Sequence, residues 1–215
     1  MAASPDARAA LSRQSERQLQ RLVLARECSA LGARPRTIEI LTGLSPRHVL
    51  RLLHAERRTP QRGRPPDTPE WYHGGTLLDR TEASVFASLY RRLHALEFGP
   101  AQSLLGAYRH YRTVCRHAPR LSFDRAFDVA RRLDGIWGAA EICFSLVRCA
   151  NCGSEYLADA GATPRSPLDC PFCKLMARYP RDPRVQTSFP TPPLPDPACL
   201  QWSLALSAQL YGRGD

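Results

Sequence analysis

Two pairs of closely spaced cysteines constrain the fold of this chain more than any other feature of its sequence. Cys149 and Cys152 form one CxxC pair, Cys170 and Cys173 form a second, and 17 residues separate the two pairs. Two such pairs on tight turns can present four sulfur ligands tetrahedrally to one metal ion. The sequence therefore predicts a single structural Zn²⁺ ion held by Cys149, Cys152, Cys170 and Cys173.

The residues around the pairs support this prediction over two alternatives. Gly153 supplies the permissive backbone that a knuckle favours, and Pro171 fixes the turn of the second pair. A redox dithiol would explain one CxxC and leave the other unexplained, while ordinary buried cysteines would not account for paired spacing. Four protein ligands leave no open position for an activated water, so the metal is expected to hold structure. The other cysteines are predicted to be small core residues: Cys28, Cys115, Cys143 and Cys199.

The positive charge of the chain is concentrated in its first third. The whole chain holds 30 basic and 20 acidic residues, and residues 1–66 hold 13 basic and 5 acidic, a net charge of +8 out of +10. All but one of the basic residues are arginines, whose planar fork suits phosphates and guanine edges. Arginine in place of lysine also reflects GC-rich coding, so the location of the charge carries the argument. It predicts that residues 1–66 neutralise phosphates.

Residues 37–53 follow the pattern of a helix-turn-helix unit. The pattern predicts a short helix over Thr37–Thr42, a turn at Gly43 and a second helix over Pro46–Glu56, with Ser45 as its N-cap. Such a unit presents the N-terminal part of its second helix to the DNA major groove.

The second of these helices has one apolar and one basic face. Val49, Leu52 and Leu53 form the apolar face, and the predicted DNA contacts on the other face are Arg47, His48 and Arg51. Glu39 departs from the pattern, because a small residue usually stands there and lets the two helices approach closely. An amphipathic helical hairpin with a solvated charged face remains the alternative.

A second basic segment lies in the proline-rich stretch of residues 59–70. Arg62-Gly63-Arg64-Pro65 resembles the core of an AT-hook, in which arginines lie along a narrow minor groove. Four prolines and a glycine also favour a plain linker. Because a candidate recognition helix precedes the segment, Arg62 and Arg64 are included among the predicted DNA contacts.

The remaining pattern predicts a mainly α fold, a helical body with a small zinc-ribbon-like module of four cysteines at its C-terminal end. Further helices are expected over residues 11–31, 81–97, 101–115 and 122–133, and a β-like pattern begins at Ile142. The first of these helices carries its apolar residues near helical spacing: Leu19, Leu22, Val23, Cys28 and Leu31. The expected regions are a basic N-terminal region (1–66), a helical body (67–141), the zinc module (142–178) and a proline-rich, disordered tail (179–215).

The sequence also excludes several classes of protein. The N-terminus has no apolar export segment and the run from Gly135 to Val147 is too short to span a bilayer, so a cytoplasmic protein without membrane contact is expected. No phosphate-binding glycine loop, HExxH or GxSxG motif is present, and we expect no enzyme. An RNA-binding or zinc-ribbon interaction protein is the main alternative, and it would need exposed aromatic residues to stack on bases.

The chain resembles the FlhC family, the zinc-binding subunits of the flagellar master transcription activator of proteobacteria. The resemblance runs from about residue 20 to 178 and combines several motifs in one order: Leu31-Gly32-Ala33-Arg34, Gly43-Leu44-Ser45, Trp71-Tyr72, Ala107-Tyr108-x-x-Tyr111 and the CxxC…CxxC set.

The resemblance implies a function that spacing does not show. Members of the family assemble with the smaller subunit FlhD, in a complex of four FlhD and two FlhC chains. This complex binds double-stranded promoter DNA upstream of flagellar operons and recruits RNA polymerase. The resemblance thus implies a DNA-binding activator subunit, with most direct DNA contacts made by the FlhC-type chain.

Overall fold

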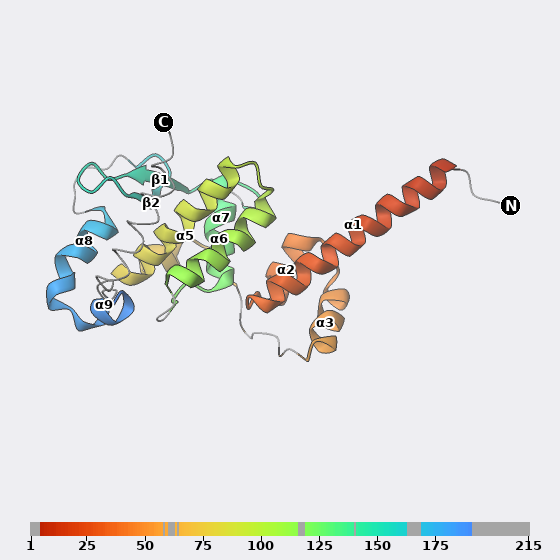
Figure 1. Ribbon diagram of the computed structural model, residues 1–215, viewed down its shortest axis with the longest axis horizontal. Coiled ribbons are helices and arrows are strands. Elements are labelled where there is room, and N and C mark those ends of the chain that lie inside the picture. The colour runs from red at the N-terminus through yellow and green to blue at the C-terminus, as the bar shows by residue number, and fades with distance from the viewer. Residues whose placement is uncertain are drawn as a thin grey trace, which may run out of the picture.

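The computed structural model is mainly helical and elongated, with α1 extending away from the rest of the molecule (Figure 1). It describes residues 5–57, 59, 63, 65–115, 119–139, 141–162 and 169–190. None of the helices in these ranges is both long enough and apolar enough to span a bilayer. The elements are α1 (Pro5–Ala30), α2 (Pro35–Thr42), α3 (Pro46–Ala55), α4 (Glu70–His73), α5 (Leu77–Ala95), α6 (Pro100–Val114), α7 (Phe123–Asp134), β1 (Phe144–Arg148), β2 (Glu155–Asp159), α8 (Pro171–Arg178), the 3₁₀ turn η2 (Tyr179–Arg181) and α9 (Pro183–Ser188).

The first three helices form a unit in which α2 and α3 pack against the C-terminal half of α1. Its apolar centre is made of fully buried side chains, among them Cys28, Ile38 and Val49. Leu19 and Val23 share the apolar spacing of α1 but are 61% and 48% exposed, because they line an open hollow between α1 and the start of α6. The apolar periodicity of the sequence predicted this helix, but the helices that pack against α1 decide which part of its apolar face is buried.

The body is built from α5, α6 and α7, whose facing sides bury aromatic rings such as Phe86, Tyr90 and Phe123. Thr76 caps α5 by accepting a hydrogen bond from the Asp79 amide, while the Asp79 carboxylate accepts one from the Thr76 amide. Gly106 allows α6 to approach α5 closely, since a Cβ there would lie 2.9 Å from Leu93 Cδ1. The helices predicted over residues 81–97, 101–115 and 122–133 are therefore present, with slightly different ends.

A buried carboxylate in the body yields a prediction about stability. Glu82 Oε2 accepts hydrogen bonds from the Tyr111 hydroxyl and from the Arg120 amide, and burial raises the pKa of this carboxyl. Glu82→Leu would leave the Tyr111 hydroxyl and the amide without that acceptor. We expect this substitution to lower the free energy of unfolding by about 1–3 kcal/mol for each donor that is left without an acceptor.

Urea unfolding of the metal-loaded protein measures this effect, with Glu82→Gln as the matched control. The glutamine oxygen can still accept both hydrogen bonds and carries no charge to desolvate, so this variant should be close to the wild type at neutral pH. Equal stabilities for the leucine and glutamine variants would contradict the prediction.

The C-terminal part of the described chain is a two-stranded hairpin followed by short helices. Strands β1 and β2 pair antiparallel, with register from Phe144 opposite Asp159 to Arg148 opposite Glu155. After α8, the turn η2 and α9 lead back toward α5, where Leu78, Leu175 and Val185 form a small apolar cluster. The boundary expected at residue 178 thus falls inside a packed group that continues to Phe189. Residues 191–215 of the expected tail lie outside the described part of the chain.

Candidate metal centre

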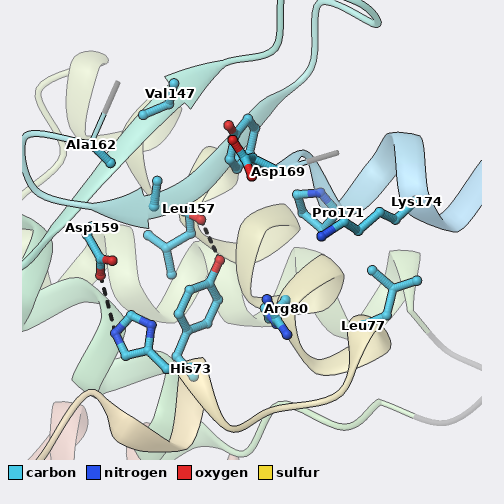
Figure 2. Close-up of a pocket in the computed structure, with 13 residues that line it drawn as sticks. His73, Leu77, Arg80, Val147, Leu157, Asp159, Ala162, Asp169, Pro171 and Lys174 are labelled. Carbon is cyan, nitrogen blue, oxygen red and sulfur yellow. Dashed lines mark hydrogen bonds and ion pairs between the residues drawn. The ribbon is translucent and has the colours of Figure 1, made fainter. Parts of the chain in front are cut away.

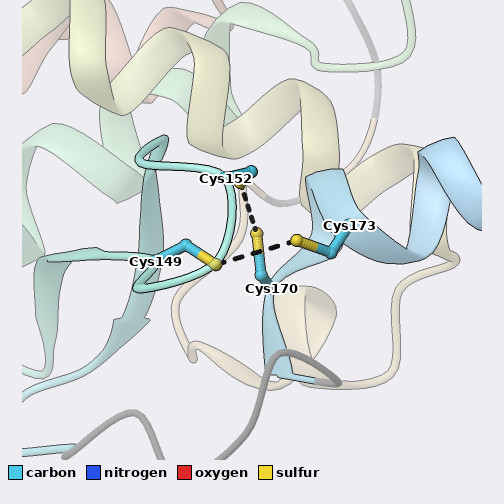
Figure 3. Close-up of side chains that lie close together, drawn as sticks. All are labelled: Cys149, Cys152, Cys170 and Cys173. Carbon is cyan, nitrogen blue, oxygen red and sulfur yellow. Dashed lines mark hydrogen bonds between the residues drawn. The ribbon is translucent and has the colours of Figure 1, made fainter.

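The four cysteines of the two CxxC pairs lie together where the turn between β1 and β2 meets the start of α8 (Figure 3). Their sulfur atoms are all within 4.8 Å of one another, and the sulfurs of Cys149 and Cys173, like those of Cys152 and Cys170, are 3.7 Å apart. Four sulfurs at about 2.3 Å from a tetrahedral zinc ion are separated by about 3.8 Å. The tetracysteine centre therefore has the geometry to hold one metal ion.

The first pair lies on the turn that joins β1 to β2. The Cys149 amide donates to the Ser154 carbonyl at 2.9 Å, and the Gly153 amide donates to the Cys149 carbonyl at 2.9 Å. Gly153 has φ +73°, in the left-handed region that glycine adopts without strain, as its position after the pair indicated. The turn therefore places both sulfurs on the side that faces α8.

The second pair lies at the start of a helix. Cys170 is the N-cap residue of α8, Pro171 is its first helical residue and Cys173 lies in its first turn. The side-chain amide of Asn151, from the opposite knuckle, donates to Cys173 Sγ at 3.4 Å. Sequence reasoning did not identify Asn151, because an asparagine inside a CxxC pair is not distinctive by itself.

Burial of the sulfurs is uneven and affects their protonation. Cys149 and Cys170 are buried, while Cys152 is exposed. Burial raises the pKa of the Cys170 thiol to about 12, whereas hydrogen bonds from Ser154 lower the pKa of Cys152 to about 6. A cation that replaces the thiol proton removes the penalty on a buried thiolate. Four protein ligands would close the coordination sphere of a bound ion and leave no position for a reactive water.

The remaining cysteines of the described chain are separate from this centre. Cys28 and Cys115 are buried in the helical core, and burial raises the pKa of each thiol to about 12. Cys143 is partly buried and accepts a hydrogen bond from Arg132 at 3.5 Å. Cys28 and Cys115 are therefore core residues as predicted, and Cys199 lies outside the described residues.

A hollow of about 180 Å³ lies beside the metal centre, between α4, α5, β2 and α8 (Figure 2). His73 Nε2 lies 3.2 Å from the Asp159 carboxylate, and Arg80 Nε donates to the Gly75 carbonyl. The Tyr72 hydroxyl donates to the backbone carbonyl of Leu157. The contacts of His73 with Asp159 and of Tyr72 with Leu157 join the hairpin to the body.

The helices predicted on either side of Gly43 are present as α2 and α3. Gly43 ends α2 with φ +67°, and its amide donates to the Glu39 carbonyl at 2.8 Å. Ser45 is the N-cap residue of α3, but its hydroxyl lies 2.8 Å from His48 Nδ1 and makes no cap hydrogen bond. The Glu39 side chain pairs with Arg36 of the same helix at 3.1 Å.

The predicted DNA contacts on α3 are on its outer face. Val49 and Leu53 are buried against the rest of the unit, whereas Arg47, His48 and Arg51 are exposed. The structure brings these three residues together on one short helix. The two remaining predicted contacts, Arg62 and Arg64, lie outside the described residues.

These features define a class: a mainly helical chain that combines a helix-turn-helix-like pair with a closed tetracysteine centre. The chain belongs to the FlhC family of flagellar transcriptional activators, whose family model matches residues 12–186. Members of this family are transcription regulators and not enzymes. The matched range continues beyond the resemblance seen at residues 20–178 and includes η2 and part of α9.

Curated relatives agree with the family match. The flagellar transcriptional regulator FlhC of Thauera aminoaromatica is 29% identical over 161 residues, which are 71% of this chain and 76% of the relative. That of Enterobacter cloacae subsp. cloacae is 28% identical over 156 residues, which are 69% of this chain and 76% of the relative. The predicted family and the predicted class of regulator are therefore confirmed.

Proposed function

We propose that this chain is the DNA-binding subunit of a flagellar transcription activator and reads the major groove with α3. The observation that carries the proposal is the outer face of α3, where Arg47, His48 and Arg51 are exposed while Val49 and Leu53 fix the opposite face in the core. A recognition helix needs this division, because the side chains that reach base edges must project from a rigid support.

The arginines of α3 are suited to direct readout. Arginine donates two parallel hydrogen bonds to guanine O6 and N7, which is the commonest specific contact in the major groove. Arg47 lies at the second position of α3, in the N-terminal part that enters the groove, and Arg51 lies about one turn later. His48 lies between them and adds a hydrogen-bonding side chain on the same face.

We propose that the metal is one structural Zn²⁺ ion. Zinc takes four thiolates tetrahedrally and has no redox chemistry, which suits a centre whose ligands are all supplied by the protein. The sulfur spacing of 3.7 Å supports this assignment. Zinc would join the hairpin to α8 at the end of the body opposite α1 (Figure 1).

The finer parts of the proposal come from the family. An FlhD-like subunit would assemble with this chain as four FlhD and two FlhC chains, and the cytoplasmic complex would recruit RNA polymerase at flagellar promoters. Co-purification with an FlhD-like subunit from the same genome, followed by a DNA shift assay with and without that subunit, tests these parts. Failure to co-purify would count against the proposed FlhD-like partner. The shift assay without that subunit tests DNA binding by this chain separately.

We predict that binding to promoter DNA weakens steeply as the salt concentration rises. Each phosphate contact releases condensed counterions, so the slope of log K against log salt is about −0.9 per contact, and six to ten contacts lose roughly a thousandfold or more between 50 and 200 mM salt. Fluorescence anisotropy with a labelled duplex from upstream of a flagellar operon measures the slope. A flat response would contradict phosphate neutralisation by the basic N-terminal region.

An RNA-binding role is the alternative that the same assay separates. Recognition of single-stranded RNA uses exposed aromatic rings, but Tyr72, Tyr90, Tyr108 and Tyr111 are buried in the described chain. We therefore expect duplex DNA to compete for the labelled probe better than single-stranded RNA of equal length. Stronger competition by RNA would favour the alternative function.

A further inference from the structure

We propose that α7 is the helix that fixes the α2–α3 pair relative to the metal centre, and that Asp124 is its principal positioning residue. The inference rests on the proposed function, since its purpose is to orient the DNA-reading helix. It follows from hydrogen bonds between segments far apart in the sequence. These bonds hold the chain just before α2 and again near the end of the proline-rich stretch of residues 59–70, called the basic linker below.

The first anchor is the carboxylate of Asp124, in the first turn of α7. Its side chain is fully buried, and Oδ1 accepts hydrogen bonds from the Arg34 amide at 3.1 Å and from the Thr37 hydroxyl at 2.5 Å. Oδ2 lies 2.7 Å from Arg34 Nη1. One carboxylate thus binds backbone, hydroxyl and guanidinium groups at the start of α2.

The second anchor is Asp128, one turn further along α7 and also fully buried. Its Oδ2 accepts a hydrogen bond from Trp71 Nε1 at 2.8 Å, and its Oδ1 accepts from Arg131 Nε at 2.8 Å and Arg132 Nε at 2.9 Å. Arg132 also donates to the backbone carbonyl of Asp67. The chain that leaves the basic linker is therefore held on the same helix as the chain that enters α2.

Helix α7 also contacts the other functional region. It packs against β1, the strand that leads directly into Cys149, and Arg132 Nη1 donates to Cys143 Sγ at 3.5 Å. The helix pair and the metal centre are thus both held by one rigid element. Loss of the Asp124 anchor would let the pair rotate, and apparent affinity falls in proportion to the fraction of molecules in the binding-competent orientation.

The test variants remove the anchor and leave the DNA-contacting side chains of α3 unchanged. Arg34→Ala removes the guanidinium, and Asp124→Asn keeps an oxygen for Thr37 and the Arg34 amide but turns a donor toward the guanidinium. Arg36→Ala is the matched control, because Arg36 is exposed and its ion pair among the described residues is with Glu39 of the same helix. The full-length, metal-loaded protein is used, together with any subunit that co-purifies with it.

We expect Arg34→Ala and Asp124→Asn each to weaken binding to the promoter duplex about tenfold while the salt slope stays that of the wild type. Loss of a phosphate contact would instead lower the slope by about one. Arg34→Lys should recover part of the affinity, and the double variant should be no weaker than either single variant. Hydrogen exchange should speed up at the Arg34 amide while the protection of α5 and α6 and the metal content remain unchanged.

Each of the following outcomes would overturn the inference. They are wild-type affinity for Arg34→Ala, a salt slope reduced by one, or equal effects of Arg34→Ala and the Arg36→Ala control. If an anchor variant loses its metal or its protection from hydrogen exchange, the Arg34→Lys variant is used instead. The inference is also refuted if Arg34→Lys has the hydrogen-exchange pattern of the wild type but binds DNA no better than Arg34→Ala. A wild-type protein that binds no promoter DNA would instead refute the proposed function, so the two failures are distinguishable.

Discussion

Cys149→Ser and Cys170→Ser are each expected to release the metal, separate the β1–β2 hairpin from α8 and abolish promoter binding. Both residues are buried, and a serine hydroxyl cannot replace a thiolate ligand at neutral pH. Structural zinc sites contribute about 10–16 kcal/mol of apparent binding free energy, which a hairpin of two five-residue strands and an eight-residue helix cannot obtain from their own packing. The loss should also appear as lower solubility, since the apolar surface shared by the hairpin and the body becomes exposed.

Native mass spectrometry and thiol titration measure this result directly. The wild-type protein should carry one metal ion and hide four thiols until a chelator is added, whereas either variant should carry none. Cys143→Ser is the matched control, because Cys143 is a partly buried cysteine outside the tetracysteine centre and serine keeps an acceptor for Arg132. A metal-free protein that stays soluble and binds DNA would show that the centre has no structural role.

The second large effect is expected from Arg47→Ala and Arg51→Ala. Each substitution should weaken promoter binding by about 1–3 kcal/mol, or roughly tenfold or more, if the arginine makes a bidentate contact to a base. Because both side chains are exposed on α3, the free energy of unfolding should change by about 0.5 kcal/mol or less. The specific loss of binding would identify α3 as the reading helix.

Anisotropy titrations on the promoter duplex and on a scrambled duplex of equal length separate specific from electrostatic loss. Arg112→Ala is the control, since Arg112 is exposed on α6 and its removal changes the net charge equally. We expect the α3 variants to lose preference for the promoter and the control to keep it. Equal losses of affinity for both duplexes would show that α3 contacts phosphates and does not read bases. Unchanged affinity for both would show that α3 lies outside the DNA interface.

The metal ligands could be predicted from the sequence because their chemistry is encoded locally. Each CxxC pair needs only a tight turn, and Gly153 and Pro171 mark the two turns. The helices of the body could be predicted for a similar reason, since apolar spacing and caps such as Ser122, which accepts from the Arg125 amide, act within a few residues.

Other features could not be predicted, because they depend on which surfaces meet. Leu96 fits the apolar pattern of its helix, yet it is 68% exposed because α5 ends at Ala95 and the side chain lies beyond the packed surface. The short helices after residue 178 were not expected, since prolines dominate that stretch. They form because Val185 and Phe189 pack against the apolar cluster on α5 and α8.

The sequence by itself determined the two CxxC pairs, the basic N-terminal third and the helix-turn-helix pattern of residues 37–53, because each is a property of neighbouring residues. Only the tertiary structure placed Arg34 against Asp124, 90 positions later, and Trp71 against Asp128, 57 positions later. Buried carboxylates require partners, but an isolated aspartate in a helical pattern does not reveal which segment will supply them. That pairing follows from the packing of whole helices, which brings distant segments into contact.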